Sequence, residues 1–208
     1  MGGDAIDGSR NAVARPKKST NGRRTGTSRK AGAVRAESRS GRGKEFRIAV
    51  SSEDAGDAEL RAAIVFLKRH VPGLLSALEV RRAEVEIWVT GEVTMAALHA
   101  RTTGDWSATD VLTFDYGSSA EQGIVSAQIA VCWDVAVKTA AEREHAPAEE
   151  LLLYVLHGIL HCLGHDDSRR ADFARMHARE DEVLSSLGFG ALFTGNGKTK
   201  ARKGRARA

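Results

Sequence analysis

Four segments of the chain carry the residue pattern of β-strands with one buried face. The clearest runs Ala-Glu-Val-Glu-Ile-Trp-Val-Thr over residues 83–90, with apolar residues at every second position from Ala83 to Val89. A period of two residues places alternate side chains on opposite faces of a sheet. The predicted strands are Arg47–Ser51, Ala83–Thr90, Val111–Tyr116 and Ile124–Cys132.

The segments between and after these strands show the period of three to four residues that is typical of amphipathic helices. In the first of them, apolar residues from Leu60 to Leu67 form one stripe, and Pro72 and Gly73 predict the end of the helix. The predicted helices are Asp57–His70, Val93–Arg101, Trp133–Arg143, Pro147–Leu163 and Arg169–Leu187. This alternation predicts an α/β (α+β) fold, with a single mixed sheet of about four strands packed with helices.

One of these helices is apolar around nearly its whole circumference. Pro147 at the first helical position predicts its beginning, and Gly164 predicts its end. Nearly all residues between Leu151 and Leu163 are apolar. Because a helix without a polar face is normally buried, we expect this one at the centre of the domain, covered by the charged helix Arg169–Leu187.

Both ends of the chain differ in composition from its middle. Residues 1–44 consist mostly of Gly, Ser, Thr, Ala, Arg and Lys, and the residues from Gly197 onward repeat this composition. Such segments bury too little apolar surface to offset the entropy lost on ordering. We therefore predict a disordered basic arm over residues 1–44, one folded domain over residues 45–190 and a disordered basic tail over residues 191–208.

Net charge is distributed unevenly along the chain. Residues 1–44 hold twelve Lys or Arg and three acids, and residues 197–208 hold six basic residues and no acid, so the two ends carry +15. Because the whole chain carries +4, the segment between them carries −11. Basic arms of this kind bind polyanions such as RNA by neutralising phosphates. Charge alone fits a solubilising extension equally well.

The cysteines and the lengths of the apolar runs indicate in which cellular compartment the protein is found. Cys132 and Cys162 stand inside apolar runs, which fits reduced core thiols in a reducing cytoplasm better than a disulfide framework. No stretch approaches the roughly 18 apolar residues of a membrane-spanning helix, and no basic region followed by an apolar run opens the chain. We expect a soluble, cytoplasmic protein.

His157 and His161 are the strongest candidates for chemistry. They lie four residues apart on the predicted central helix, so their imidazoles project from one face and can share a metal ion. A single buried histidine is more often a hydrogen-bonded core residue, but two on one apolar helix face are costly to bury without a shared partner. The pair therefore predicts a zinc site. The other histidines are expected to be ordinary surface or helix-end residues: His70, His99, His145 and His177.

A catalytic zinc site needs a third protein ligand and an open position for water. Directly after Gly164, the sequence supplies His165, Asp166 and Asp167. His165 is the commoner type of zinc ligand and would reach the ion if the helix continued through Gly164. Asp167 would reach it if the helix ended and the chain turned back, which is the arrangement that Gly164 favours. With three ligands, the fourth position would hold a water whose pKa zinc lowers toward about 7, which indicates a hydrolase.

The block His157-Gly-Ile-Leu-His161-Cys-Leu-Gly164-His-Asp-Asp167 resembles the signature of the YbeY family of bacterial rRNA maturation endoribonucleases, His-Gly-x-Leu-His-Leu-x-Gly-Tyr-Asp-His. Upstream, Thr109-Asp110-Val111-Leu112-Thr113-Phe114 is similar to the family's Pro-Thr-Asp-Val-Leu-Ser-Phe. Gly123-Ile124-Val125 and Met176–Gly188 resemble its next strand and its closing helix. The resemblance covers about residues 46–190.

The resemblance implies a zinc-dependent endoribonuclease that cleaves single-stranded RNA, with a role in maturation of the 16S rRNA 3′ end and in ribosome quality control. It implies RNA and the small ribosomal subunit as partners. It also implies one zinc ion per chain, held by His157, His161 and Asp167, with His165 as the alternative third ligand. The family has His in place of Asp167, and a carboxylate oxygen is an acceptable zinc ligand.

One further family residue has a different counterpart in this chain. The family's phosphate-contacting Arg corresponds to Thr103 when residues are counted back without gaps from Thr109. Arg101 lies two residues away and is the candidate catalytic residue. It could take that role if the loop Thr102–Ser107 has a different shape from the family's.

Two other function classes remain open at this point. The spacing His-x-x-x-His-x-x-Gly-x-x-Asp also resembles zinc peptidases whose third ligand is Asp. Those enzymes carry Glu directly after the first His as general base, where this chain has Gly158. A ribosome-associated RNA-binding protein with a structural metal would need only the basic arms and a closed metal site. RNA cleavage would separate the nuclease from both.

Overall fold

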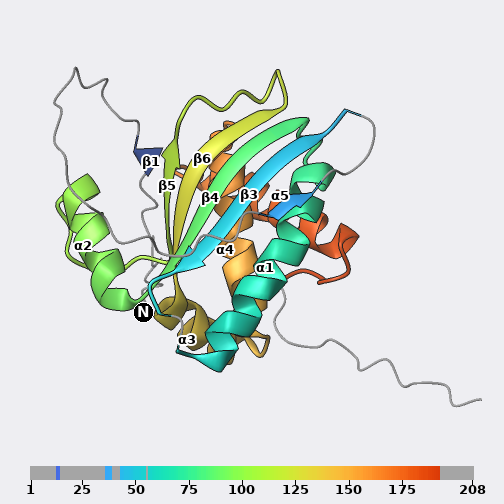
Figure 1. The fold of residues 1–208 in the computed structure, drawn as a ribbon. Helices are drawn as coiled ribbons and strands as arrows, with labels where there is room; N and C mark the ends of the chain where they lie inside the picture. The colour runs from blue at the N-terminus through green and yellow to red at the C-terminus, as the bar shows by residue number, and fades with distance from the viewer. Residues whose placement is uncertain (1–12, 15–35, 39–42, 55, 193–208) are drawn as a thin grey trace, which may run out of the picture.

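Alternating apolar residues build the strands of one sheet in the computed structural model, which describes residues 13–14, 36–38, 43–54 and 56–192 (Figure 1). The strands are β1 (Val13–Ala14), β2 (Ala36–Ser38), β3 (Glu45–Ser52), β4 (Arg82–Thr90), β5 (Val111–Asp115) and β6 (Ile124–Cys132). The helices are α1 (Ala58–Ala77), α2 (Glu92–Thr103), α3 (Trp133–Arg143), α4 (Pro147–Cys162) and α5 (Arg170–Ser186).

The sheet is mixed and has the strand order β1-β5-β6-β4-β3-β2. Strands β3, β4 and β6 are parallel, whereas β5 runs antiparallel to β6. The four strands predicted from the sequence form its centre, and the two short strands β1 and β2 extend its edges. The predicted fold class, one mixed sheet packed with helices, is confirmed.

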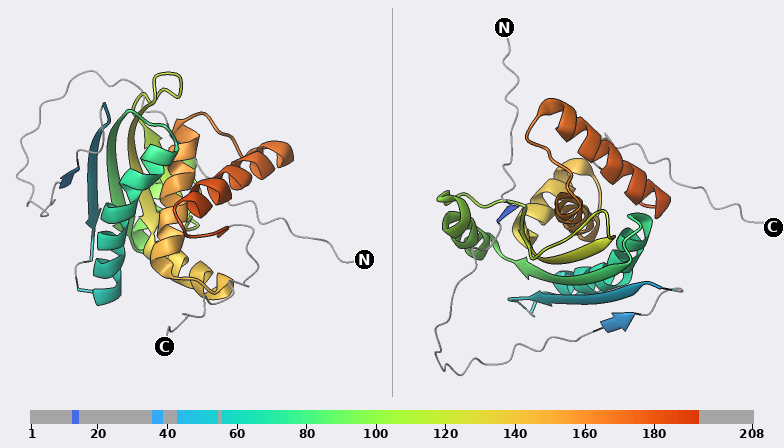
Figure 2. Two further views of the ribbon diagram at one scale, coloured as in Figure 1. Left: turned by 90° about the vertical axis from the view of Figure 1, so that its right-hand side faces the viewer. Right: turned by 90° about the horizontal axis from the view of Figure 1, so that it is seen from above.

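The helices α1 and α4 lie side by side on one face of the sheet (Figure 2). In β4, the residues that point to this face are buried, and those that point away, from Arg82 to Trp88, are exposed. Helix α5 packs on the outer side of α4 and α1. Every residue of α4 from Glu150 to Leu160 is buried, so the predicted central helix is also confirmed.

Helix α1 continues beyond its predicted end. It passes through Pro72 to Ala77, seven residues past His70. A proline inside a helix lacks an N–H donor and costs about 3 kcal/mol. However, Val71, Leu74 and Leu75 are fully buried, and burying a side chain of this size stabilises the fold by about 1.5–3 kcal/mol. Packing of the last two turns therefore outweighs the local penalty.

Strands β1 and β2 come from the segment that we predicted to be disordered. The backbones of their five residues pair with the edges of β5 and β3. An unpaired strand edge offers a row of hydrogen-bonding groups to any neighbouring chain. Most of the two predicted arms lies outside the described residues, so the domain boundaries and the disorder of the arms stay predictions.

Both cysteines occupy the positions expected for core residues. Cys132 and Cys162 are buried and free, and neither belongs to a possible metal-binding group among the described residues. The helices within the described part of the chain are all too short or too polar to cross a membrane.

Candidate metal centre

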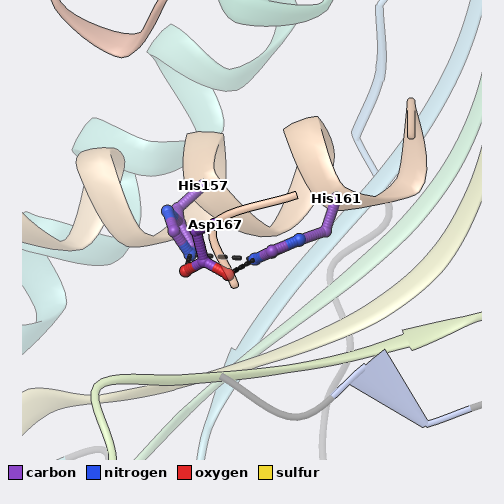
Figure 3. A group of neighbouring side chains, drawn as sticks. All are labelled: His157, His161 and Asp167. Atoms are coloured by element: carbon purple, nitrogen blue, oxygen red, sulfur yellow. Dashed lines mark hydrogen bonds and ion pairs between the residues drawn. The ribbon is translucent and has the colours of Figure 1, made fainter. Parts of the chain in front are cut away.

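Helix α4 places the two candidate histidines on one face. His157 and His161 point toward each other, and their Nε2 atoms lie 3.0 Å apart (Figure 3). His157 is 7% exposed, and His161 is partly buried. Because they lie one helical turn apart, the two imidazoles present their Nε2 atoms to the same point in space.

The end of α4 turns the chain back toward these imidazoles. The helix ends at Cys162, and Gly164 adopts φ +88°. The N–H of Gly164 donates to the carbonyl of His161, and the N–H of His165 donates to the carbonyl of Leu160. This pair of hydrogen bonds is the Schellman motif, in which a residue with positive φ, usually glycine, reverses the chain. The predicted helix end before His165 is confirmed.

The turn brings Asp167 to the two histidines (Figure 3). Its Oδ2 lies 3.6 Å from His157 Nε2, and its Oδ1 lies 3.9 Å from His161 Nε2. These three residues form one of the possible metal-binding groups among the described residues, and the His165 side chain is not part of it. His165 contributes its main-chain carbonyl instead, which accepts a hydrogen bond from His161 Nδ1 at 3.1 Å.

The two imidazoles and the Asp167 carboxylate fit a tetrahedral metal ion such as zinc. Ligands at about 2.0–2.2 Å from zinc are spaced about 3.3–3.6 Å apart. The two Nε2 atoms are 3.0 Å apart, and each lies close to one carboxylate oxygen of Asp167, His157 Nε2 at 3.6 Å from Oδ2 and His161 Nε2 at 3.9 Å from Oδ1. The Nδ1 atoms of both histidines are engaged in other hydrogen bonds. The Nε2 atoms are therefore the ones available to an ion, and three protein ligands would leave one position for water.

The electrostatic environment of the centre favours a cation. Burial alone would lower the pKa of His157, but contacts with the Asp167 and Glu180 carboxylates raise it to about 9. Burial and the neighbouring charge of His157 lower the pKa of His161. The contact with His157 also lowers the pKa of Asp167. One positive charge between the rings and the carboxylates is therefore stabilised, and a metal ion would supply such a charge.

Sequence reasoning missed two residues next to this centre. Glu180 is fully buried in α5, and its Oε1 accepts a hydrogen bond from His157 Nδ1 at 2.7 Å. Its other oxygen contacts Nδ1 of His177. A signal for them existed, because Glu180 lies on the same helical stripe as the buried residues Met176, Val183 and Leu184.

The remaining histidines were predicted to be ordinary surface or helix-end residues, and two of them, His99 and His177, are instead buried within helices. His177 is 7% exposed, and His99 is 5% exposed, with Nδ1 2.8 Å from the Ser107 carbonyl. His145 is half-buried, with its Nε2 atom 2.5 Å from Glu150 Oε2. His70, which packs beside Phe189, is also half-buried. Each of the two buried rings has a polar partner, which is what allows a histidine to be buried.

The candidate catalytic residue Arg101 is exposed in the last turn of α2. The Thr103 hydroxyl donates to the His99 carbonyl at 2.9 Å and accepts from the Asp105 N–H at 3.1 Å. The loop after α2 is therefore held by its own hydrogen bonds, with Thr103 turned into it. A catalytic role of Arg101 stays a prediction.

Gly158 lies where α4 packs closely on the sheet. A Cβ atom at this position would lie 2.5 Å from Thr113 Oγ1 and 3.3 Å from Ile129 Cγ2. Thr113 and Ile129 are paired across β5 and β6 and are buried, so neither side chain can move away freely. A glutamate at this position, as in the peptidases, has no room.

We expect Gly158→Ala to destabilise the protein. Overpacking a buried contact costs about 1–3 kcal/mol, and the higher helix propensity of alanine offsets at most about 1 kcal/mol of this. A net loss of about 1–2 kcal/mol should lower the melting temperature by about 2–8 °C, at about 2–4 °C per kcal/mol for a domain of this size. The matched control is Gly73→Ala in α1, where the added Cβ would meet Leu187 at an ordinary 3.4 Å. A Gly158→Ala variant that melts at or above the temperature of the Gly73→Ala variant would contradict this prediction.

Comparisons with known proteins identify one family and several similar chains. The family model described as Endoribonuclease YbeY matches residues 54–188. An Endoribonuclease YbeY from Anaeromyxobacter sp. is 32% identical over 142 residues, which cover 68% of this chain and 74% of that one. An Endoribonuclease YbeY from Chloroflexus aggregans is 33% identical over 141 residues, covering 64% and 92%. A Thermotoga maritima protein with a solution structure aligns with a TM-score of 0.45 and 24% identity, over 67% of this chain and 91% of that one.

The matched range of the family model spans well over half of the chain and contains α4, the turn at Gly164 and the whole candidate metal centre. By this match, and by its 32% identity to the Anaeromyxobacter relative over 68% of its length, the chain belongs to the YbeY family.

Proposed function

We propose that this chain is a zinc-dependent endoribonuclease that cleaves single-stranded RNA in the cytoplasm, in maturation of the 16S rRNA 3′ end and in ribosome quality control. The family relatives named Endoribonuclease YbeY support the nuclease activity. The observation that carries the zinc dependence is the convergence of His157 Nε2, His161 Nε2 and the Asp167 carboxylate on one point.

The residues of the centre have distinct tasks in this proposal. When bound there, zinc would supply Lewis acidity toward a phosphate oxygen and lower the pKa of a water molecule to about 7. His157, His161 and Asp167 hold the ion. The His165 carbonyl orients the His161 ring through Nδ1. Arg101, exposed at the end of α2, is the candidate for contacting the substrate phosphate.

The geometry at Gly158 argues against peptidase chemistry. A zinc peptidase of this motif needs a carboxylate directly after the first histidine as its proton acceptor. A Cβ atom at that position would lie 2.5 Å from Thr113 Oγ1 and 3.3 Å from Ile129 Cγ2, closer than ordinary van der Waals contact. A larger residue there would displace α4 from the sheet, so the close packing of α4 on β5 and β6 is incompatible with a general base at this point.

The test is cleavage of an end-labelled single-stranded RNA by the full chain, with a duplex of the same sequence as the control substrate. We expect cleavage of the single strand, its loss after removal of metal with a chelator, and its recovery on addition of zinc. A protein that holds zinc and binds RNA without cleaving it would overturn the nuclease proposal in favour of a ribosome-associated RNA-binding protein. Proteolysis of an unfolded protein substrate would favour the peptidase.

The basic ends of the chain are proposed to supply much of its RNA affinity. Replacing the eighteen Lys and Arg residues of 1–44 and 197–208 with Gln should weaken RNA binding and flatten its salt dependence. Each lost phosphate contact reduces the slope of log K against log salt by about 0.7 for single strands. RNA binding is measured by fluorescence titration at several salt concentrations. The Gln variant is compared with the wild-type protein and with a variant that lacks both ends, which also lacks β1 and β2. An unchanged slope in the Gln variant would show that the ends act as solubilising extensions.

A further inference from the structure

A buried carboxylate in α5 lies between two imidazoles at the edge of the metal centre. Glu180 is fully buried, and one carboxylate oxygen lies 2.7 Å from His157 Nδ1. The other oxygen contacts Nδ1 of His177. Both histidines are 7% exposed. The carboxylate therefore has two ring N–H donors as partners and is shielded from water.

The contact with Glu180 determines which nitrogen of His157 carries the proton and which nitrogen faces the metal centre. A carboxylate can only accept hydrogen bonds, so the Nδ1 atom of His157 must carry the proton that it donates to Glu180. The ring is then oriented with Nε2 toward His161 Nε2 and Asp167. A negative charge on the far side of the ring makes Nε2 a better donor to a cation.

His177 in turn holds Glu180. An ionised carboxylate is costly to bury without hydrogen-bond donors on its oxygens. His157 is bonded to one carboxylate oxygen of Glu180, Oε1. His177 supplies the hydrogen-bond donor for the other oxygen, Oε2. Phe173 packs edge to face on the His177 ring at 4.1 Å between centroids. The His177 ring is thus held by Phe173 on one side and Glu180 on the other.

His157, His177 and Glu180 also form a group that could hold a metal ion. However, each oxygen of Glu180 already lies at hydrogen-bond distance from one of the two rings. Both contacts are hydrogen bonds, and they occupy the Nδ1 atoms of both histidines. His157 therefore acts as a bridge, with Nδ1 bound to Glu180 and Nε2 facing the metal centre.

We infer that Glu180 is the positioning residue of the metal centre, which orients His157 through Nδ1 and raises the affinity of the site for zinc, and that His177 holds Glu180 in place. This inference rests on the proposed function only in requiring that the centre binds a metal ion. It assigns a role to two residues outside the proposed ligand set of His157, His161 and Asp167.

The experiment is a measurement of zinc affinity by chelator competition with the full chain. Glu180→Gln keeps the shape of the side chain and removes its charge, and the zinc dissociation constant should rise about 10- to 100-fold. The matched control is Glu182→Gln, which removes an exposed carboxylate from the same helix and should leave the affinity unchanged. Far-UV circular dichroism of the metal-free proteins shows that both variants are folded.

A second pair of variants tests His177. His177→Ala should weaken zinc binding, and His177→Asn should restore most of it, because the Asn amide places a donor close to the position of Nδ1. The absorption spectrum of the cobalt-loaded protein should change in Glu180→Gln and not in Glu182→Gln, since the orientation of a ligand is altered. A purely structural role would leave this spectrum unchanged.

Equal zinc affinity in Glu180→Gln and Glu182→Gln would overturn the inference. If Glu180→Gln does not fold, a zinc affinity of His177→Ala equal to that of the wild-type protein overturns the inference in the same way. Failure of the proposed function has a different outcome. In that case the wild-type protein cleaves no RNA, while the order of zinc affinities among the variants still decides the role of Glu180.

Discussion

Substitution of His157 or His161 with Ala is expected to remove most of the zinc from the protein, together with its RNA cleavage. Each variant keeps only two of the three protein ligands, and the remaining pair cannot hold the ion at neutral pH against bulk water. Zinc content of the purified proteins by elemental analysis and single-strand cleavage are the two measurements. The control is His70→Ala, a histidine outside the centre that packs beside Phe189, which should keep about one zinc per chain.

The two variants should differ in stability, which makes the result easier to interpret. His161 is partly buried, and removing its ring leaves the hydrogen bond between His157 and Glu180 in place. Removing His157 deprives the fully buried Glu180 of one of its two donors, and an unsatisfied buried polar group costs about 1–3 kcal/mol. His157→Ala should therefore melt at a lower temperature than His161→Ala. Full zinc content in both variants would refute the assignment of the centre.

The central helix could be predicted from the sequence because its signals are local. Pro147 and Gly164 mark its ends, its body is apolar, and the spacing of His157 and His161 follows from the helical period alone. The turn at Gly164 was predictable for the same reason, since a glycine directly after a helix favours positive φ. Local residue identity thus predicted the two histidines and the approach of Asp167.

The parts that could not be predicted depend on contacts between distant segments. Glu180 is buried because it meets His157, 23 residues earlier in the chain, and helix periodicity does not identify such a partner. Pro72 normally ends a helix, and only the burial of the turns around it keeps α1 intact. Strand β1 consists of two residues whose pairing with β5 leaves no mark in composition. Tertiary packing decides each of these cases.

The third ligand can be identified by three substitutions. Asp167→Ala should lose zinc, because it removes the carboxylate that lies 3.6 and 3.9 Å from the two Nε2 atoms. Asp167→His should retain zinc, since an imidazole is an equally suitable ligand. His165→Ala should change zinc content little, because His165 contributes its main-chain carbonyl to His161 Nδ1 and alanine keeps that carbonyl. Elemental analysis of the three purified variants separates the candidates.

The pH dependence of RNA cleavage is a second measurement that identifies the third ligand. A carboxylate ligand brings negative charge to the ion, so water at a centre with Asp167 should be less acidic than at a centre with three neutral imidazoles. The rate of cleavage by Asp167→His should therefore rise at lower pH than that of the wild-type protein. Zinc lost only in His165→Ala, with Asp167→Ala fully loaded, would transfer the ligand role to His165. The turn after Gly164 would then have to rearrange on metal binding, because the present turn holds the His165 N–H on the Leu160 carbonyl.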